Sequence, residues 1–225
     1  MSGTDERAAV PTIPALGVSR LLLVATGSVS SADLPFWCTW LRTCYPEMAV
    51  KVVLTRGANR FVTTAGLHGR VPGEVLADEW PDGQGAAAHV LLQDWAEAVI
   101  VHPATLHYLA RFALGLADCP SLLALQCTSA PIAIAPALPP GGATSHAYLS
   151  HRRAVESRDN VALCPPRRGV SVTTGKPDSW APALLPECVE ALEALRLRMA
   201  RRDAAAEPSE PSGDGSARMS AEEGR

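Results

Sequence analysis

The sequence predicts a doubly wound α/β fold, in which helices cover both faces of a parallel sheet. Short apolar runs at 20–25, 50–54 and 98–101 have the length of strands that are buried on both faces. Each run ends in small or polar residues and leads into a helical pattern. Strand, turn and helix repeated in this way indicate a Rossmann-like (flavodoxin-like) three-layer α/β/α arrangement that binds ligands at the carboxyl ends of its strands.

The chain has 225 residues, of which 47% are hydrophobic, so one domain can bury a core. We expect a flexible arm at 1–18, the domain at 19–202 and a disordered tail at 203–225. A net charge of −3 gives no electrostatic reason to bind nucleic acid or a membrane. No apolar run reaches the ~18–20 residues that cross a bilayer, and the N-terminus has no signal core, so we expect a cytoplasmic protein.

The six cysteines do not have the spacing of a metal site. None forms a C-x-x-C pair, and no Cys/His cluster has zinc spacing, so we expect no metal ion. In a cytosolic chain, cysteines are most simply small core residues. They are Cys38, Cys44, Cys119, Cys127, Cys164 and Cys188.

The first half of the chain contains two strand–turn–helix units. The strand at 20–25 ends in a Thr-Gly-Ser turn that can bind phosphate or a cofactor, and a helix is expected over 31–45. The strand at 50–54 leads into a short helix over 59–67. The segment 69–88 is rich in Gly, Ala, Pro and acidic residues, which predicts a surface loop.

The stretch 98–118 organises the rest of the chain. Pro103 is expected to end the strand at 98–101, because proline has no backbone N–H. Thr105 can cap the helix that we expect over 105–116. A strand that enters a helix through a tight turn of small residues is typical of a site for an anionic or planar cofactor.

Two more short strands are expected at 122–126 and 132–135, and the polar residues 127–129 between them are candidates for cofactor contacts. The structure-breaking residues at 139–141 (Pro-Pro-Gly) exclude a helix or strand there.

The C-terminal part begins with a helix expected over 144–158. Extended runs at 161–163 and 169–173 predict a hairpin. The last helix, 186–202, has an apolar face that should pack on the sheet.

The stretch after the central strand resembles a known family. Residues 103–107 (Pro-Ala-Thr-Leu-His) and 113–118 (Ala-Leu-Gly-Leu-Ala-Asp) are similar to the Pro-Ala-(Ser/Thr)-Ala-Asn-Thr signature, and the helix after it, of the homo-oligomeric flavin-containing cysteine decarboxylases. His89 stands where this family has its active-site histidine. The likeness covers about 20–176 with its motifs in order, and it implies a flavoprotein.

The resemblance implies that a flavin binds at the turns after the strands. FMN is the default in this family, although FAD is also possible. The residues that match the family's flavin-binding motifs are Thr26, Gly27, Ser28, Val29, Thr55, Ala58, Phe61, Pro103, Ala104 and Thr105.

The resemblance also implies the reaction. A base takes the thiol proton of a C-terminal cysteine, and hydride passes from its β-carbon to the flavin. The resulting thioaldehyde loses carbon dioxide and leaves an enethiol. His89 is the candidate base, because an imidazole can take a thiol proton near neutral pH.

In the family, two asparagines and a mobile clamp hold the substrate. His107 replaces the first asparagine, and a histidine can also donate to a carboxylate. Pro139 replaces the second, at the start of an expected clamp over about 139–176, and Lys176 resembles the basic residue that closes the clamp. These departures leave open which cation binds the substrate carboxylate. Further candidates are Arg152, Arg153, Arg167 and Arg168.

Two branches of the family end at different products. The coenzyme A branch uses a clamp cysteine as a proton donor, but the segment 165–176 has no cysteine, and Cys164 comes before it. The peptide branch is therefore favoured. Its members decarboxylate the C-terminal cysteine of a ribosomally made precursor peptide towards an aminovinyl-cysteine ring, as in lanthipeptide, linaridin and thioamide peptide biosynthesis.

Three alternatives stay open. They are a phosphopantothenoylcysteine decarboxylase of coenzyme A synthesis, a flavin prenyltransferase, and a non-catalytic flavin-binding regulatory subunit. The resemblance further implies a homotrimer or homododecamer. Its partners would be a Cys-terminated precursor peptide and other peptide-modifying enzymes.

Overall fold

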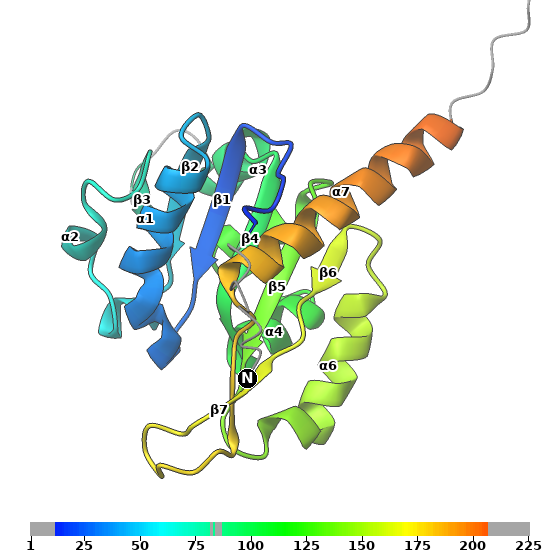
Figure 1. The fold of residues 1–225 in the computed structure, drawn as a ribbon. Helices are drawn as coiled ribbons and strands as arrows, with labels where there is room; N and C mark the ends of the chain where they lie inside the picture. Colours follow the sequence, from blue (N-terminus) through cyan, green and yellow to red (C-terminus); the bar gives the residue numbers. More distant parts are fainter. Residues whose placement is uncertain (1–11, 82, 84–86, 207–225) are drawn as a thin grey trace, which may run out of the picture.

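A computed structural model describes residues 12–81, 83 and 87–206 (Figure 1). Its centre is a six-stranded sheet in the order β3-β2-β1-β4-β5-β6, in which every pair is parallel. The strands are β1 (Arg20–Ala25), β2 (Ala49–Leu54), β3 (Val75–Ala77), β4 (Ala98–Thr105), β5 (Ile132–Ala137) and β6 (Val161–Leu163). The predicted doubly wound α/β fold is confirmed.

Helices lie on both faces of this sheet (Figure 1). The α-helices are α1 (Leu34–Cys44), α2 (Thr64–Leu67), α3 (Ala88–Trp95), α4 (Leu106–Ala113), α5 (Pro120–Cys127), α6 (His146–Glu156) and α7 (Leu185–Ala206). Three short 3-10 helices are η1 (Val29–Asp33), η2 (Ala58–Arg60) and η3 (Gly142–Thr144). Within the described ranges, none of the helices has the length and apolar character needed to span a membrane.

Two apolar cores form on the two faces of the sheet, because the side chains of a strand alternate. In β1, Leu21 and Leu23 pack with α1, α2 and α7, whereas Leu22 and Val24 pack with α3, α4, α5 and α6. Strands buried on both faces explain the continuous apolar runs of the sequence.

The strand β4 does not stop at Pro103 as expected. It continues to Thr105, and its register against β5 shifts between Val101 and Ala104. The missing N–H is tolerated at this irregularity, and the Pro103 carbonyl accepts bonds from Thr26 instead. The helix α4 then begins at Leu106 and ends at Ala113, so it is shorter than predicted.

Two other predictions in this half of the chain are wrong. Residues 122–126 belong to helix α5, not to a strand, because a short apolar run buried on all sides gives the same pattern for both. The expected loop 69–88 contains β3, a three-residue edge strand too short to leave a pattern. The helices expected over 31–45 and 59–67 each include a separate 3-10 turn.

The expected hairpin pairs different segments. Residues 161–163 form β6 of the main sheet, and the antiparallel ribbon consists of β7 (Arg167–Gly169) and β8 (Ser179–Ala181). The segment between them extends beyond the carboxyl ends of the strands (Figure 1). The breakers after β5 form a turn, in which Gly141 has a φ of 73° that favours glycine.

The termini differ from the predicted boundaries. Residues 12–18 run along the domain, where the Tyr45 hydroxyl donates to the Pro14 carbonyl at 2.7 Å and the Gly17 N–H donates to Glu193 at 3.1 Å. The helix α7 extends to Ala206, four residues past the expected end of the domain at 202. Residues 1–11 and 207–225 lie outside the described part of the chain.

Candidate active site

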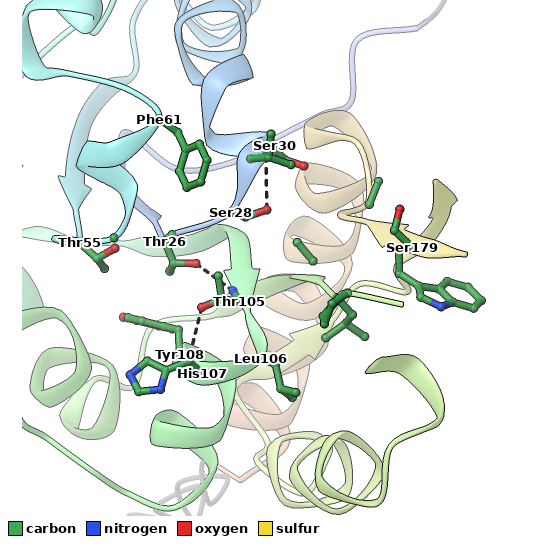
Figure 2. Close-up of a pocket in the computed structure, with 18 of the residues that line it drawn as sticks. Thr26, Ser28, Ser30, Thr55, Phe61, Thr105, Leu106, His107, Tyr108 and Ser179 are labelled. Atoms are coloured by element: carbon green, nitrogen blue, oxygen red, sulfur yellow. Dashed lines mark hydrogen bonds between the residues drawn. The ribbon is translucent and has the colours of Figure 1, made fainter. Parts of the chain in front are cut away.

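An open cleft of about 1500 Å³ lies at the carboxyl ends of the strands. Its walls come from the turns after β1, β2, β4 and β5, from the segment after β3, and from the β7–β8 ribbon. Nine residues predicted from the sequence line it: Thr26, Gly27, Ser28, Val29, Thr55, Phe61, Thr105, His107 and Pro139. Figure 2 labels Thr26, Ser28, Thr55, Phe61, Thr105 and His107 among them. Residues far apart in the sequence therefore meet in one place, as expected for a doubly wound sheet.

The turns after β1 and β2 touch each other through glycines. A Cβ on Gly27 would lie 3.0 Å from the Gly57 Cα, and a Cβ on Gly57 would lie 3.0 Å from the Gly27 Cα. Side chains here would force the turns apart, so backbone and small hydroxyl groups form this end of the cleft. Ser28 caps η1 by accepting from the Ser30 N–H at 3.4 Å (Figure 2). Such a floor is suited to a phosphate group.

The Thr26 hydroxyl joins the ends of β1 and β4 (Figure 2). It donates to the Pro103 carbonyl at 2.7 Å and accepts from the Thr105 N–H at 2.8 Å. Thr26 is 1% exposed, so these bonds are shielded from water. Thr26 therefore fixes the position of the turn at the start of α4.

Helix α4 presents polar side chains to the cleft from its first turns. Thr105 caps it by accepting from the Tyr108 N–H at 3.2 Å, as predicted. His107 is exposed and lines the cleft, and Arg111 follows one turn later on the same wall. Arg111 pairs with Asp118, and this pairing lowers the pKa of the Asp118 carboxyl. The positive end of the helix and His107 together favour an anionic ligand group.

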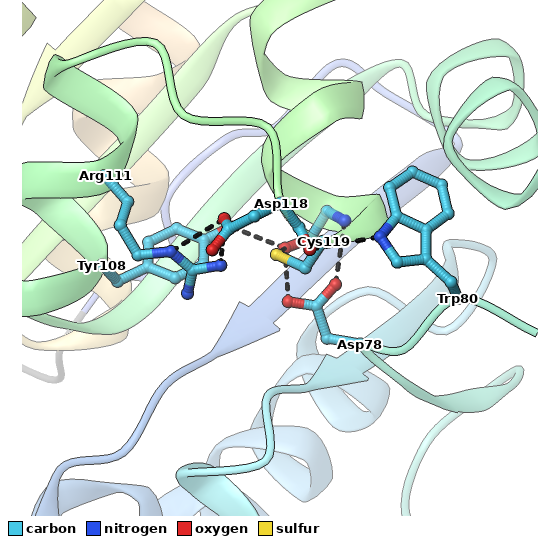
Figure 3. A network of polar contacts seen from close by, with 7 residues as sticks. Asp78, Trp80, Tyr108, Arg111, Asp118 and Cys119 are labelled. Atoms are coloured by element: carbon cyan, nitrogen blue, oxygen red, sulfur yellow. Dashed lines mark hydrogen bonds and ion pairs between the residues drawn. The ribbon is translucent and has the colours of Figure 1, made fainter.

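A buried polar network beside the cleft was not predicted from the sequence (Figure 3). The Asp78 carboxylate accepts from the Ser121 N–H and hydroxyl, both at 2.8 Å. The Ser121 hydroxyl also lies 2.7 Å from the Tyr108 hydroxyl, whose pKa is raised by burial and by the charge of Asp78. Asp78 thus caps α5 from 43 residues away, a contact with no local sequence signal.

His89 does not line the cleft, but it contacts a residue that does. The Trp80 indole lines the cleft and packs edge-to-face against the His89 ring, with centroids 5.7 Å apart. The His89 Nδ1 atom is buried and has no hydrogen-bond partner among the described residues.

Four other predicted residues lie outside the cleft lining. Ala58, Pro103 and Ala104 are buried beneath it, where they support the turns. Lys176 is exposed at the ribbon tip, and its carbonyl accepts from the Ser171 N–H at 2.8 Å. The prediction that residues 127–129 contact the cofactor is wrong. These residues precede β5, so they lie at the amino ends of the strands, whereas the cleft lies at the carboxyl ends.

The ribbon forms the wall of the cleft on its apolar side. Trp180 of β8 exchanges two backbone hydrogen bonds with Leu138, at 2.8 and 2.9 Å, and both residues line the cleft with Leu106. The Arg168 guanidinium lies 5.3 Å from the centroid of the Trp180 ring. The cleft therefore has a polar end at β1 and β2 and a more apolar end at β5 and the ribbon.

Basic side chains at the cleft are few in the described part of the chain. Arg56, His107 and Arg111 line it, and the candidates Arg152, Arg153, Arg167 and Arg168 do not. Because Asp118 already neutralises Arg111, Arg56 and His107 are the better candidates for a carboxylate.

The position of Cys164 does not support a role as the proton donor of the coenzyme A branch. This thiol is 2% exposed in the core beside Cys188, and a hydrogen bond between the two thiols together with burial raises the pKa of Cys188. Cys164 does not line the cleft. Four of the six cysteines are buried, as expected, whereas Cys127 is exposed and Cys44 half-buried.

Comparison with known proteins connects this geometry to a family. A family profile described as Flavoprotein matches residues 15–181. The cypemycin cysteine dehydrogenase (decarboxylating) of Streptomyces sp. is 34% identical over 161 residues, which are 68% of this chain and 79% of that protein. The crystal structure of the cypemycin decarboxylase CypD is similar with a TM-score of 0.66 and 29% identity, over 84% of this chain and 99% of that one.

Two further relatives come from the peptide branch and from the coenzyme A branch. The FMN-dependent cysteine decarboxylase TvaF from thioviridamide biosynthesis has a TM-score of 0.61 and 31% identity, over 67% of this chain and 91% of that one. The coenzyme A biosynthesis bifunctional protein CoaBC of Haemophilus influenzae is 39% identical over 97 residues, which are 41% of this chain and 23% of that protein. The chain belongs to the flavoprotein family of the homo-oligomeric flavin-containing cysteine decarboxylases.

Proposed function

We propose that this chain oxidatively decarboxylates the C-terminal cysteine of a ribosomally made precursor peptide to an enethiol, towards an aminovinyl-cysteine ring. The observation that carries the proposal is the shape of the cleft. Its glycine-rich end suits a cofactor phosphate, while its open end under the β7–β8 ribbon leaves room for a peptide. The relatives that act on cysteine in cypemycin and thioviridamide synthesis support the same function.

We propose FMN as the cofactor, with FAD as the alternative. The residues present fit a flavin: contacting glycines and the hydroxyls of Ser28 and Thr55 would hold its phosphate, and Leu106 would face its ring. When bound, a flavin supplies the acceptor for the hydride that leaves the cysteine β-carbon. The description of TvaF as FMN-dependent favours FMN.

The protein's own groups would bind, orient and deprotonate the substrate. His107, at the positive end of α4, would bind the terminal carboxylate, with Arg56 as a second candidate. Pro139 and the ribbon would enclose the peptide and exclude water from it. His89 would take the thiol proton at a ring nitrogen. Because His89 does not itself line the cleft, the substrate would have to extend past Trp80 to lose its proton there. Such a base contributes about 10²–10⁴-fold in rate.

The test is a mass-spectrometric assay of the flavin-loaded protein with Cys-terminated peptides. We expect loss of carbon dioxide and two hydrogen atoms from the peptide, and loss of this product with His89→Asn while the flavin stays bound. A peptide that returns unchanged, with flavin bound, would contradict the proposal.

Phosphopantothenoylcysteine decarboxylation is the second candidate, favoured by the similarity to CoaBC. It is distinguished by its product. Loss of carbon dioxide alone from the small substrate would identify it, whereas the absence of a cysteine in the segment 165–176 argues against that outcome.

We also propose that the chain forms a homotrimer or a homododecamer. Exposed apolar side chains on α3 and just after α4 could be covered by a second copy, since Leu91 is 54% exposed and Leu114 is 66% exposed. Sedimentation of the flavin-loaded protein tests this, and a monomer would contradict it.

A further inference from the structure

The side chain of Trp80 is held by a hydrogen bond to the segment before α5 (Figure 3). Its indole N–H donates to the Asp118 carbonyl at 3.1 Å, and the Asp118 carboxylate is in turn held by the Arg111 Nε at 2.9 Å. The indole therefore has a defined position on the cleft wall although Trp80 is 46% exposed.

The backbone that carries Trp80 is also anchored. Asp78, two residues earlier and 7% exposed, accepts two hydrogen bonds of 2.8 Å from Ser121 at the start of α5. Ser121 is tied to Tyr108 of α4 by the 2.7 Å contact of their hydroxyls. The segment after β3 is thus locked onto the two helices that flank the cleft.

The indole in turn packs on the His89 ring. The two rings meet edge-to-face at 74°, with centroids 5.7 Å apart, a geometry that stabilises aromatic pairs. The buried Nδ1 atom of His89 has no hydrogen-bond partner among the described residues. Among the described residues, no polar group orients this imidazole through a hydrogen bond to Nδ1. The packing of the Trp80 indole against the ring orients it instead.

We propose that Trp80 is a positioning residue for His89, and this rests on the proposed role of His89 as the base. The Asp78–Ser121 and Trp80–Asp118 bonds fix the indole, and the indole fixes the plane of the imidazole and keeps water from its buried side. Trp80 acts through His89 and takes no proton itself.

The experiment compares Trp80→Ala, Trp80→Phe and the control Trp40→Ala in the flavin-loaded full chain. Trp40 is a suitable control because it also forms edge-to-face pairs, with Trp37 and Tyr45, on the far side of the molecule from this network. We expect Trp80→Ala to lower kcat roughly tenfold with KM changed less than about twofold. Trp80→Phe, which keeps a ring, should restore most of kcat, and Trp40→Ala should leave it unchanged.

A second measurement does not depend on turnover. Carbethoxylation of each histidine, followed by peptide mass spectrometry, reports how well each imidazole is shielded. We expect His89 to react several-fold faster in Trp80→Ala than in the original chain, while the exposed His68 reacts at its former rate. If the original chain transforms no peptide, the proposed function fails, and the His89 reactivity still tests the positioning.

Three results would overturn the proposal. An unchanged kcat and an unchanged His89 reactivity in Trp80→Ala would show that the indole does not position the imidazole. A parallel rise in reactivity at His89 and His68, with a lower melting temperature, would show a role in folding only. Loss of flavin absorbance in Trp80→Ala would make the indole a cofactor contact instead.

Discussion

The contact between the two glycine turns gives a prediction whose size follows from the structure. Replacing Gly27 by alanine would place a Cβ 3.0 Å from the Gly57 Cα, 3.1 Å from its carbonyl carbon and 3.3 Å from its oxygen. All three are backbone atoms, which cannot rotate away as the end of a side chain can. The turns after β1 and β2 must therefore move apart by a few tenths of an ångström.

The cost of such overpacking is about 1–3 kcal/mol. If flavin binding requires the present separation of the turns, this cost appears as weaker binding. Since ~1.4 kcal/mol corresponds to a tenfold change in a dissociation constant, we expect Gly27→Ala to weaken flavin binding by about 5- to 150-fold.

The assay is titration of the flavin-free chain, followed by flavin fluorescence and by thermal unfolding. Gly66→Ala is the matched control, because a Cβ there would meet only the Thr63 Oγ1 atom at an ordinary 3.6 Å and would lie in the short helix α2. If Gly27→Ala kept the flavin affinity and the melting temperature of the original chain, the contact between the two turns would not shape the cofactor site.

Three other predictions concern groups outside the cofactor turns. Asp78→Ala should lower the free energy of unfolding in urea by about 2–3 kcal/mol, because it leaves the buried Ser121 N–H without an acceptor and removes one partner of the Ser121 hydroxyl. Burial lowers the pKa of His102 from its ordinary 6.5, so the folded chain binds this proton less readily than the unfolded one. Stability should therefore decline as the pH falls below about 6.5 towards the folded-state pKa, and His102→Gln should show a flatter profile. Cys164→Ser should keep the peptide activity, measured by product mass, because this thiol lies outside the cleft.

Each of these has an outcome that would count against it. An unfolding curve for Asp78→Ala that matches that of Asp159→Ala, a variant of an exposed ion pair, would show that the network does not stabilise the fold. Identical pH profiles for His102→Gln and the original chain would remove His102 as the source of the slope. A saturated thiol product in the original chain that becomes an enethiol in Cys164→Ser would instead indicate the coenzyme A branch, with Cys164 as its proton donor.

The strands of the sheet could be predicted because they are buried on both faces. Such strands read as continuous apolar runs, as in β1 and β2, and each ends in a turn at the same edge of the sheet. That single rule is enough to place the turns at Thr26 and Thr55 together with Thr105 from the sequence. The cap of α4 was also predictable, because a threonine side chain bonds to its own local backbone.

The features that could not be predicted depend on partners far away in the sequence. Asp78 bonds to Ser121 across 43 residues, and Trp80 to Asp118 across 38. The β7 strand pairs with β8, although neither three-residue strand has an alternating pattern of its own. Helix α5 has the pattern of a strand because its apolar residues are buried all round, which removes the helical period.

The most direct test of the central claim is the mass of a Cys-terminated peptide after incubation with the flavin-loaded chain. We predict loss of carbon dioxide together with two hydrogen atoms from the peptide, and no change with His89→Asn, which should retain its flavin. An unchanged peptide, or loss of carbon dioxide alone from phosphopantothenoylcysteine, would contradict the assignment to oxidative decarboxylation of a peptide.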